Sequence, residues 1–519
     1  MENIKYGIEA SEGIKKGMDT LANAVKTTLG PKGKNVIIDR GAGMLPLITK
    51  DGVTVAKHIN LEDRFEAMGA QLIQEVASQA EQGSGDGTTT ATVITQAILK
   101  EGLKLTAAGY DPNELKMGID RGVMQAEKYL NSIAIPVTTD SDMVKSIATI
   151  SANNNEEIGE LIANAFKLVG EHGGVDVAEG RGSETEIEVV KGLQFDRGMV
   201  SPYFSTNPDG MEVTLKDPYI MLVDGKLSRV EDVVPTLENV IKAGRSLLII
   251  AEDITGQALA TLAINKTRGG AEVCAVKVPG FGSQRGELLD DYAVLTDGAV
   301  CDIKDIDTFT GGMLGQADSV TITQHSTVVV GAKGMDQEIQ ERIGRLTKEK
   351  EKLESSFERK QLENRIAKMA GGIALISVGG NSEVEMREKM HRIIDAKEAV
   401  ISALEEGIVP GGGVALLEAI NHIDDVDNET EQKGIELLKE ALKSPIRTIC
   451  ENAGKNGDVV IESIRRHGTS GRLGYDAKND EYHDMIVVGI IDPKKVTKVA
   501  LRNASSVAGT VLTTGCAIT

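Results

Sequence analysis

The sequence predicts a multidomain α+β protein in which one domain is built from both ends of the chain. Its 519 residues correspond to about three domains at roughly 150 residues each. Apolar residues recur at helical spacing near both ends, whereas the middle alternates strand and helix patterns. We therefore expect a nested order, with an insert inside the terminal domain and a second insert inside the first.

The first 130 residues are predicted to be mainly helical. A helix is expected before Gly30 and Pro31, which supply a C-cap and a stop, and a short strand is expected at 35–39. In ITKDGVTVA (48–56), Asp51 and Gly52 lie between β-branched residues, which predicts a hairpin-type turn. Residues 61–130 are expected to form helices on both sides of a glycine loop.

The centre of the chain is predicted to be richer in strands. Two short helices are expected between 134 and 170, and strand patterns begin near 175. SLLIIAEDI (246–254) and AEVCAVKVP (271–279) are strand patterns on either side of a helix near 257–267. A charge-laced helical pair at 335–371 precedes the strand IALISVGG (373–380), and another helix runs through Glu405 and Glu406. The last hundred or so residues are again mainly helical.

Composition excludes several classes of protein. The 57 Lys and Arg face 78 Asp and Glu, for a net charge of −21, and Trp is absent, which argues against a nucleic-acid partner. The 4 cysteines contain no C-x-x-C pair and the histidines no H-x-x-x-H spacing, which argues against structural zinc and fits a reducing compartment. No secretory signal and no apolar run of about 20 residues is present, so we expect a cytoplasmic protein with no membrane partner.

The loop GSGDGTTTATV (83–93) is the first candidate for chemistry. Glycine amides, threonine hydroxyls and the positive end of the following helix suit a phosphate, and Asp86 suits a Mg²⁺ that bridges carboxylate to phosphate. The chain has no G-x-x-x-x-G-K-[ST] motif, so the lysine of a P-loop is missing. The alternative is a flexible loop before a helix that is capped by its own Asp and Thr side chains.

Three further glycine or proline segments lie in the two helical end regions. They are TLGPKG (28–33), VPGGGVALLEAI (409–420) and IIDPKKV (490–496), the last with Asp492 before its proline. Each alone is an ordinary cap or turn. Together they suit a cleft that both ends of the chain build.

Asp395 is a second candidate, at the edge of the apolar stripe of its predicted helix. A carboxylate there could polarise a water toward a γ-phosphate, or it could be a solvated surface charge. Two central helices and the segment around Ser201 also carry apolar residues, which suit either core packing or a surface for apolar partners. Those residues are Tyr203, Phe204, Val233, Val234, Leu237, Val240, Ile241, Leu259, Leu262, Ala263 and Ile264.

The chain resembles the group I (GroEL-type) chaperonins over essentially its whole length. The segments that carry the resemblance, in order, are TLGPKGKNVIID, ITKDGVTVA, EVASQAEQGSGDGTTTATV, ISANN, GLQFDRGMVSPYF, LLIIAEDI, VKVPGFG, MAGGIALISVGG, EEGIVPGGGVALL and GIIDPKKV. The resemblance implies a chaperonin fold with a mainly helical equatorial domain (1–133 and 406–519), an intermediate hinge domain (134–190 and 374–405) and an α/β apical domain (191–373). It also implies homo-oligomeric rings of seven subunits, commonly two stacked.

The resemblance further implies an ATP site with Mg²⁺ and K⁺. Asp86 matches the family's magnesium-binding acid, Asp395 the acid that promotes hydrolysis, and Asp51 a second acid near the attacking water. The implied nucleotide contacts are Leu29, Gly30, Pro31, Lys50, Asp51, Asp86, Gly87, Thr88, Thr89, Thr90, Ile150, Ser151, Gly412, Asp476, Ala477 and Asp492. The metals, loop amides, hydroxyls and helix end would then neutralise the phosphates without a P-loop lysine.

The implied function is ATP-dependent protein folding. Unfolded polypeptides and the mobile loop of a small GroES-type co-chaperonin would bind an apical apolar patch, and ATP would drive enclosure of the client in the ring. The implied patch is Met199, Tyr203, Phe204, Val234, Leu237, Leu259, Ala263 and Ile264. In the implied ring-to-ring contact region, Lys455 and Asn456 stand where the family often has acids, so Arg447 is expected to lack its usual partner.

Two other classes of function remain open. A small-molecule ATP-dependent enzyme, such as a kinase, would need a second catalytic constellation, which the sequence does not display. The second is a divergent relative that binds proteins but passes poorly through the ATPase cycle, and the acids at 51, 86 and 395 argue against it.

Overall fold

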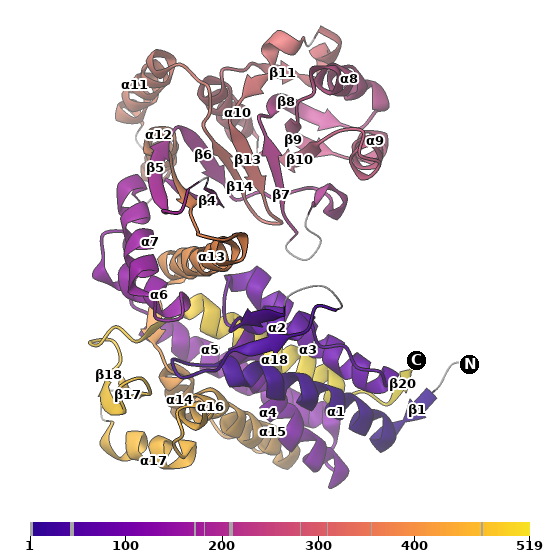
Figure 1. The fold of residues 1–519 in the computed structure, drawn as a ribbon, viewed down its shortest axis with the longest axis vertical. Coiled ribbons are helices and arrows are strands. Elements are labelled where there is room, and N and C mark those ends of the chain that lie inside the picture. Colours follow the sequence, from indigo (N-terminus) through magenta and orange to yellow (C-terminus); the bar gives the residue numbers. More distant parts are fainter. Residues whose placement is uncertain are drawn as a thin grey trace. The chain divides into compact units, whose positions relative to one another are not determined.

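The computed structural model describes residues 4–41, 46–170, 173–180, 182–206, 211–280, 282–308, 310–353, 355–468 and 471–519 (Figure 1). The chain divides into two compact units. The first unit comprises Met1–Ala163 with His391–Thr519, and the second comprises Asn164–Met390. Among the described residues, no helix has both the length and the hydropathy that crossing a bilayer requires.

The first unit is mainly helical and its helices come from both ends of the sequence. Its long helices are α1 (Gly7–Val25), α3 (Arg64–Ser84), α4 (Thr88–Ala107), α5 (Pro112–Ile133), α15 (Glu429–Ala441) and α18 (Lys494–Leu512). Its shorter ones are α2 (Gly52–Lys57), α6 (Asp142–Ser151), α14 (Val414–Ala419), α16 (Ser444–Asn452) and α17 (Gly457–His467). The boundaries between the units fall inside α7 (Glu156–Val169) and α13 (Glu383–Glu406).

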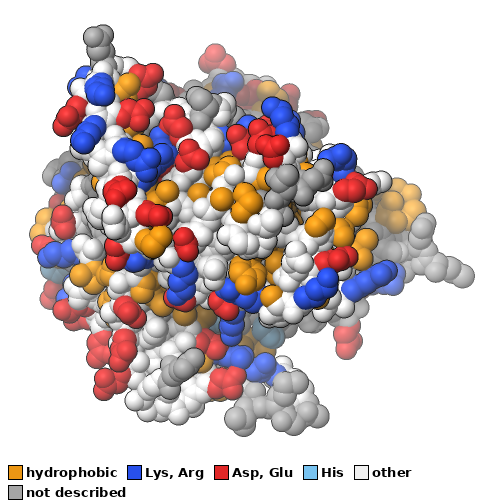
Figure 2. Space-filling model, turned by 90° about the horizontal axis from the view of Figure 1, so that it is seen from above, with side chains coloured by type: hydrophobic (Ala, Val, Ile, Leu, Met, Phe, Trp, Pro, Cys, Tyr) orange, Lys and Arg blue, Asp and Glu red, His pale blue; other side chains and the backbone are white. Residues whose placement is uncertain are grey.

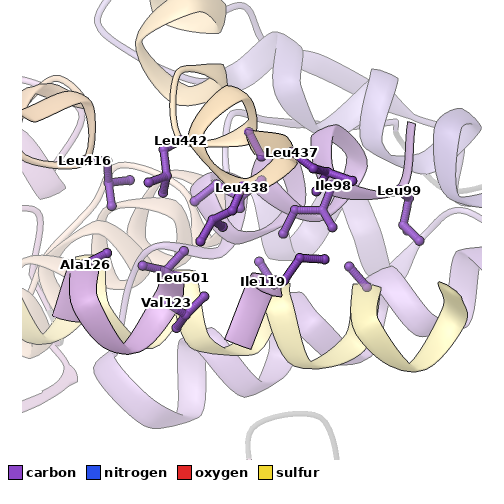
Figure 3. Packing of buried hydrophobic residues seen from close by; sticks show 14 of the residues in the cluster. Ile98, Leu99, Ile119, Val123, Ala126, Leu416, Leu437, Leu438, Leu442 and Leu501 are labelled. Carbon is purple, nitrogen blue, oxygen red and sulfur yellow. The ribbon is translucent and has the colours of Figure 1, made fainter. Parts of the chain in front are cut away.

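One hydrophobic core joins the N-terminal and C-terminal helices of this unit. α18 packs on α3, α4 and α5, and α15 packs on α5, so yellow and purple helices lie side by side in Figure 1. In Figure 3, Ile119 and Val123 of α5 meet Leu438 of α15 and Leu501 of α18. Burial of such side chains is the main stabilising contribution, at roughly 25 cal/mol per Å² of apolar surface.

Short antiparallel pairs complete the first unit. β1 (Ile4–Tyr6) pairs with β20 (Cys516–Ile518), and β2 (Val36–Ile38) with β3 (Leu47–Thr49). β16 (Ile408–Pro410) pairs with β19 (Ile491–Pro493), and β17 (Leu473–Asp476) with β18 (Glu481–Asp484). The β16–β19 pair places the segment before Gly411 beside Asp492, although the two lie far apart in sequence.

The described residues of the second unit form three sheets. The largest contains the strands β8 (Tyr219–Leu227), β9 (Leu247–Ile254), β10 (Val273–Lys277) and β11 (Val300–Asp302). These strands are all parallel in the order β10-β9-β8-β11, and β12 (Gly315–Gln316) pairs antiparallel with β8. They read as nearly continuous apolar runs, as expected of parallel strands covered on both faces. The helices α8 (Val234–Ala243), α9 (Gly256–Thr267) and α10 (Ser283–Thr296) connect them.

The other two sheets of this unit are smaller. β6 (Gly192–Phe195), β14 (Thr327–Val330), β13 (Ser319–Ile322) and β7 (Val213–Lys216) form an antiparallel sheet in that order. β15 (Ile373–Val378) lies between β4 (Gly174–Glu179) and β5 (Glu186–Val190). The helical pair predicted at 335–371 is confirmed as α11 (Asp336–Lys352) and α12 (Ser356–Gly371).

Basic as well as acidic side chains lie on the surface, although the net charge is −21. On the face drawn in Figure 2, acidic and basic side chains are interspersed, and hydrophobic side chains lie in several groups between them. Mixed charge of this kind favours solubility without creating a field of one sign on that face.

One local prediction is wrong. Asp51 and Gly52 do not form a hairpin turn, because Asp51 caps α2 by accepting hydrogen bonds from the amides of Val53 (3.2 Å) and Thr54 (2.8 Å). Within its own chain Arg447 has two acidic partners, since its Nη2 lies 2.8 Å from Glu440 Oε1 and 2.6 Å from Asp458 Oδ1. The second partner comes from the first turn of α17, which packs on α16. The loss of its usual ring-to-ring partner stays a prediction.

Candidate functional site

A cavity of about 640 Å³ lies in the first unit, which is within the usual range for a ligand pocket. Its walls come from loops and element ends at both termini of the chain. Every residue of the predicted nucleotide site lines it, and so does Asp395. The four glycine and proline segments singled out in the sequence therefore meet around one space.

The glycine loop and the N-terminus of α4 form one part of the cavity wall. α3 ends at Ser84, Gly85 has φ 70° and Gly87 has φ 88°, so both glycines adopt a conformation that other residues rarely take. Gly87 is also the N-cap of α4, and no side chain caps this helix. The structure does not bear out the capped-helix alternative, and the first amides of α4 can serve an anion.

The carboxylates of Asp86, Asp492 and Asp395 line the cavity, and no ion pair to any of them is found among the described residues. Burial raises the pKa of Asp86, and the charge of Asp51 adds to the effect, whereas hydrogen bonds from Gly87 N and Ser151 Oγ oppose it. Burial also raises the pKa of Asp492 to about 7, and the charge of Asp86 contributes. Ionised carboxylates are therefore disfavoured here until a cation offsets their desolvation and mutual repulsion.

Asp395 lies in the cavity wall and is not a solvated surface charge. It is half-buried on α13, and burial raises the pKa of its carboxyl well above the ordinary range, followed by the charges of Asp51 and Asp86. Ser151 links the two sides of the site, since its Oγ lies 3.2 Å from Asp86 Oδ2 and 3.1 Å from the carbonyl oxygen of Asp395.

Asp51 and Lys50 also line the cavity. Both carboxylate oxygens of Asp51 accept hydrogen bonds at the start of α2, including one from Thr54 Oγ1 at 2.6 Å. Capping the helix therefore uses much of the hydrogen-bond accepting capacity of this carboxylate. Lys50 Nζ donates to the carbonyl of Gly30 at 3.2 Å. Burial lowers the pKa of Lys50, and the charge of Arg392 adds to this.

The β17–β18 hairpin also contributes to the cavity wall. Asp476 accepts hydrogen bonds from Lys478 N (2.8 Å) and from Asn479 Nδ2 (2.7 Å), which shapes the turn that holds Ala477. Tyr475, Asn479 and Ile449 also line the cavity and were missed in the sequence. Asn479, three residues after Asp476 in a turn, had a recognisable Asx-type signal. Tyr475 and Ile449 had none, because their patterns match ordinary core residues.

The predicted apolar patch lies in the second unit and is only partly exposed. Tyr203 is 72% exposed and Ile264 49%, whereas Met199, Val234, Leu259 and Ala263 are half-buried. Phe204 and Leu237 do not fit the predicted exposed patch, since they are 0% and 3% exposed and belong to the core. Leu237 lies on α8 with the buried Val240, whereas Phe204 ends a short 3₁₀ turn that packs on α9.

Comparison with known proteins gives a consistent result. The model of the TCP-1/cpn60 chaperonin family matches residues 21–519. The chain is also similar to two crystal forms of the chaperonin gp146 from the bacteriophage EL 2 (Pseudomonas aeruginosa), both in the presence of ATP-BeFx. Form II is 23% identical, with 99% of this chain and 98% of that chain covered and a TM-score of 0.72. Form I is 22% identical, with 99% of each chain covered and a TM-score of 0.65. This similarity confirms the predicted fold.

Proposed function

Because the chain belongs to the TCP-1/cpn60 chaperonin family, it is an ATP-dependent protein-folding chaperonin and an ATPase, and we propose that the cavity of the first unit binds and hydrolyses the ATP. One observation carries the proposal: the nucleotide-site residues predicted from both ends of the chain all line this cavity. The uncapped N-terminus of α4 supports placing the phosphates over Thr88, Thr89 and Thr90.

We assign Mg²⁺ to Asp86. The donor set fits, because a carboxylate whose pKa is raised by burial gains most from a cation, and Mg²⁺ usually takes one or two carboxylates together with phosphate oxygens. Among the described residues, no three His, Cys, Asp or Glu side chains form a protein-only metal site, so the ion would arrive with the nucleotide. When bound, it neutralises phosphate charge. A K⁺ ion beside the phosphates belongs to the same proposal.

We assign the activation of the attacking water to Asp395. A carboxylate accepts a proton only when ionised, and burial, followed by repulsion from Asp51 and Asp86, favours the neutral form of Asp395. Cations in the cavity would offset that repulsion and restore the base. Asp51 would lie near the same water, but its role is mainly to orient α2 because its oxygens cap that helix.

The larger assembly follows from the family. Chaperonins form oligomeric rings and act on client proteins. The finer proposals are the group I type, rings of seven subunits with two rings stacked, and a GroES-type co-chaperonin. A cytoplasmic location stays a prediction.

We further propose three domains: 1–133 with 406–519 (equatorial), 134–190 with 374–405 (intermediate) and 191–373 (apical). ATP binding would shift the population between two arrangements of these domains. Unfolded clients would bind the apical patch through apolar burial, and the exposure of Tyr203 and Ile264 supports that surface. Phe204 and Leu237 are left out of the proposed patch because they are buried in the core of their unit.

The test is ATP-dependent refolding of a chemically denatured client by the purified chain. We expect ATP turnover and recovery of client activity with Mg²⁺ and ATP together, and neither when Mg²⁺ is chelated. Electron microscopy of the same samples, with and without ATP, counts the subunits per ring. Turnover that is unaffected by chelation would overturn the assignment of Asp86, and a turnover that depends on one small-molecule substrate would favour the kinase alternative.

A further inference from the structure

We propose that Ser402 is a positioning residue, which sets the register of α13 against the glycine loop and so places Asp395 opposite Asp86. This inference rests on the role proposed above for Asp395. Ser402 Oγ donates a hydrogen bond to the carbonyl oxygen of Ser84 at 2.9 Å. The two serines are 2% and 3% exposed, so water does not compete for this bond.

One face of α13 lies along the loop. Asp395, Glu398 and Ser402 are spaced i, i+3 and i+7, so they share that face. A Cβ built on Gly85 would lie 2.2 Å from Glu398 Cβ, which shows how closely the helix crosses the loop there. At one end of this contact Ser402 donates its hydrogen bond to Ser84. At the other end, Ser151 Oγ lies within hydrogen-bond distance of both Asp86 Oδ2 and the Asp395 carbonyl oxygen.

The bond to Ser84 satisfies a group that its own helix leaves unpaired. Ser84 is the last residue of α3, and the final carbonyls of a helix have no intrahelical partner. An unpaired carbonyl at this depth would be costly, so the arrangement with Ser402 opposite Ser84 is favoured over a rotated or shifted helix. Apolar contacts are not directional and would not by themselves select one register.

Other buried hydroxyls of this unit behave differently. Thr95 Oγ1 donates to Ala91 O and Ser505 Oγ to Arg502 O, each within its own helix. Such local bonds are the usual outcome for a serine or threonine inside a helix. Ser402 instead reaches a second element, 318 positions away in sequence, and that element carries Asp86.

The test compares Ser402→Ala with Ser505→Ala, a buried serine whose bond stays within α18. We expect Ser402→Ala to lower kcat for ATP by about fivefold while KM changes by less than about twofold, because one hydrogen bond is lost outside the nucleotide contacts. Ser505→Ala should leave both constants near the wild-type values. A Ser402→Ala variant with wild-type kcat would overturn the proposal.

A double-mutant cycle with Asp395→Ala separates positioning from general destabilisation. If Ser402 acts through Asp395, Ser402→Ala should not slow the residual turnover of Asp395→Ala any further. An equal fold-loss in both backgrounds would contradict the proposal. Should Ser402→Ala fail to assemble, Ser402→Cys keeps the shape with a weaker donor and should show a smaller loss of kcat in the same cycle. Wild-type turnover by Asp395→Ala itself would instead overturn the role proposed for Asp395.

Discussion

Ser151 Oγ lies 3.2 Å from Asp86 Oδ2, although the two residues are 65 positions apart in the sequence. The same hydroxyl oxygen lies 3.1 Å from the carbonyl of Asp395, which is 244 positions away. Three separate elements, the glycine loop, α6 and α13, therefore meet at one hydroxyl group. The candidate site depends on this convergence, and the following predictions test its parts separately.

Asp395→Ala should slow ATP hydrolysis by about tenfold or more, because it removes the proposed base. Nucleotide affinity should stay within about twofold of wild type, since the phosphates are proposed to bind the α4 N-terminus and not this carboxylate. Steady-state turnover and calorimetric titration of ATP measure the two quantities on one preparation. If hydrolysis is unchanged, another group activates the water.

Asp86→Ala should abolish the dependence of ATP binding on Mg²⁺. The variant lacks the carboxylate that is proposed to hold the metal, so residual binding should be equally weak with and without Mg²⁺. Titration of ATP in Mg²⁺ and in chelator measures this, and Asp427→Ala, at an exposed site on the same unit, is the control. A wild-type response of the Asp86→Ala variant to Mg²⁺ would place the metal elsewhere.

Asp492 should make the nucleotide-free protein less stable as the pH rises. Burial raises its pKa from 3.8 to about 7, so the folded state binds the proton more tightly than the unfolded state does. The stabilising effect of that proton is complete below about pH 3.8 and is lost as the pH rises through 7. Asp492→Asn should therefore raise Tm relative to wild type more at pH 8 than at pH 5. An equal change in Tm at both pH values would contradict this direction.

Tyr203→Ser should weaken the capture of an unfolded client without lowering Tm, because the side chain is 72% exposed. Leu237→Ser should instead lower Tm, since removing a buried leucine costs about 2 kcal/mol or more of folding free energy. Client capture by light scattering and thermal melting of each variant measure the two effects. Normal capture by Tyr203→Ser at unchanged Tm would remove this residue from the patch.

Local signals in the sequence predicted much of the fold and of the site. Gly85, Asp86 and Gly87 could be recognised because a tight loop before a helix requires glycine and an acid suits a metal. The helices of the first unit were predicted because apolar side chains recur along one face. The turn at Asp51 was misjudged because an aspartate before a glycine suits a turn and a helix cap equally well, and long-range packing of α2 selects the cap.

By itself the sequence determined the family, the order of helical and β-rich segments, and the residue types available for phosphate and metal binding. Only the tertiary structure decided that those residues share one cavity, that Asp395 faces it, and that Phe204 and Leu237 are buried. The physical reason is that backbone preferences and apolar periodicity act over a few residues. Which face of a helix is covered depends on contacts between segments hundreds of positions apart, such as Ser402 with Ser84.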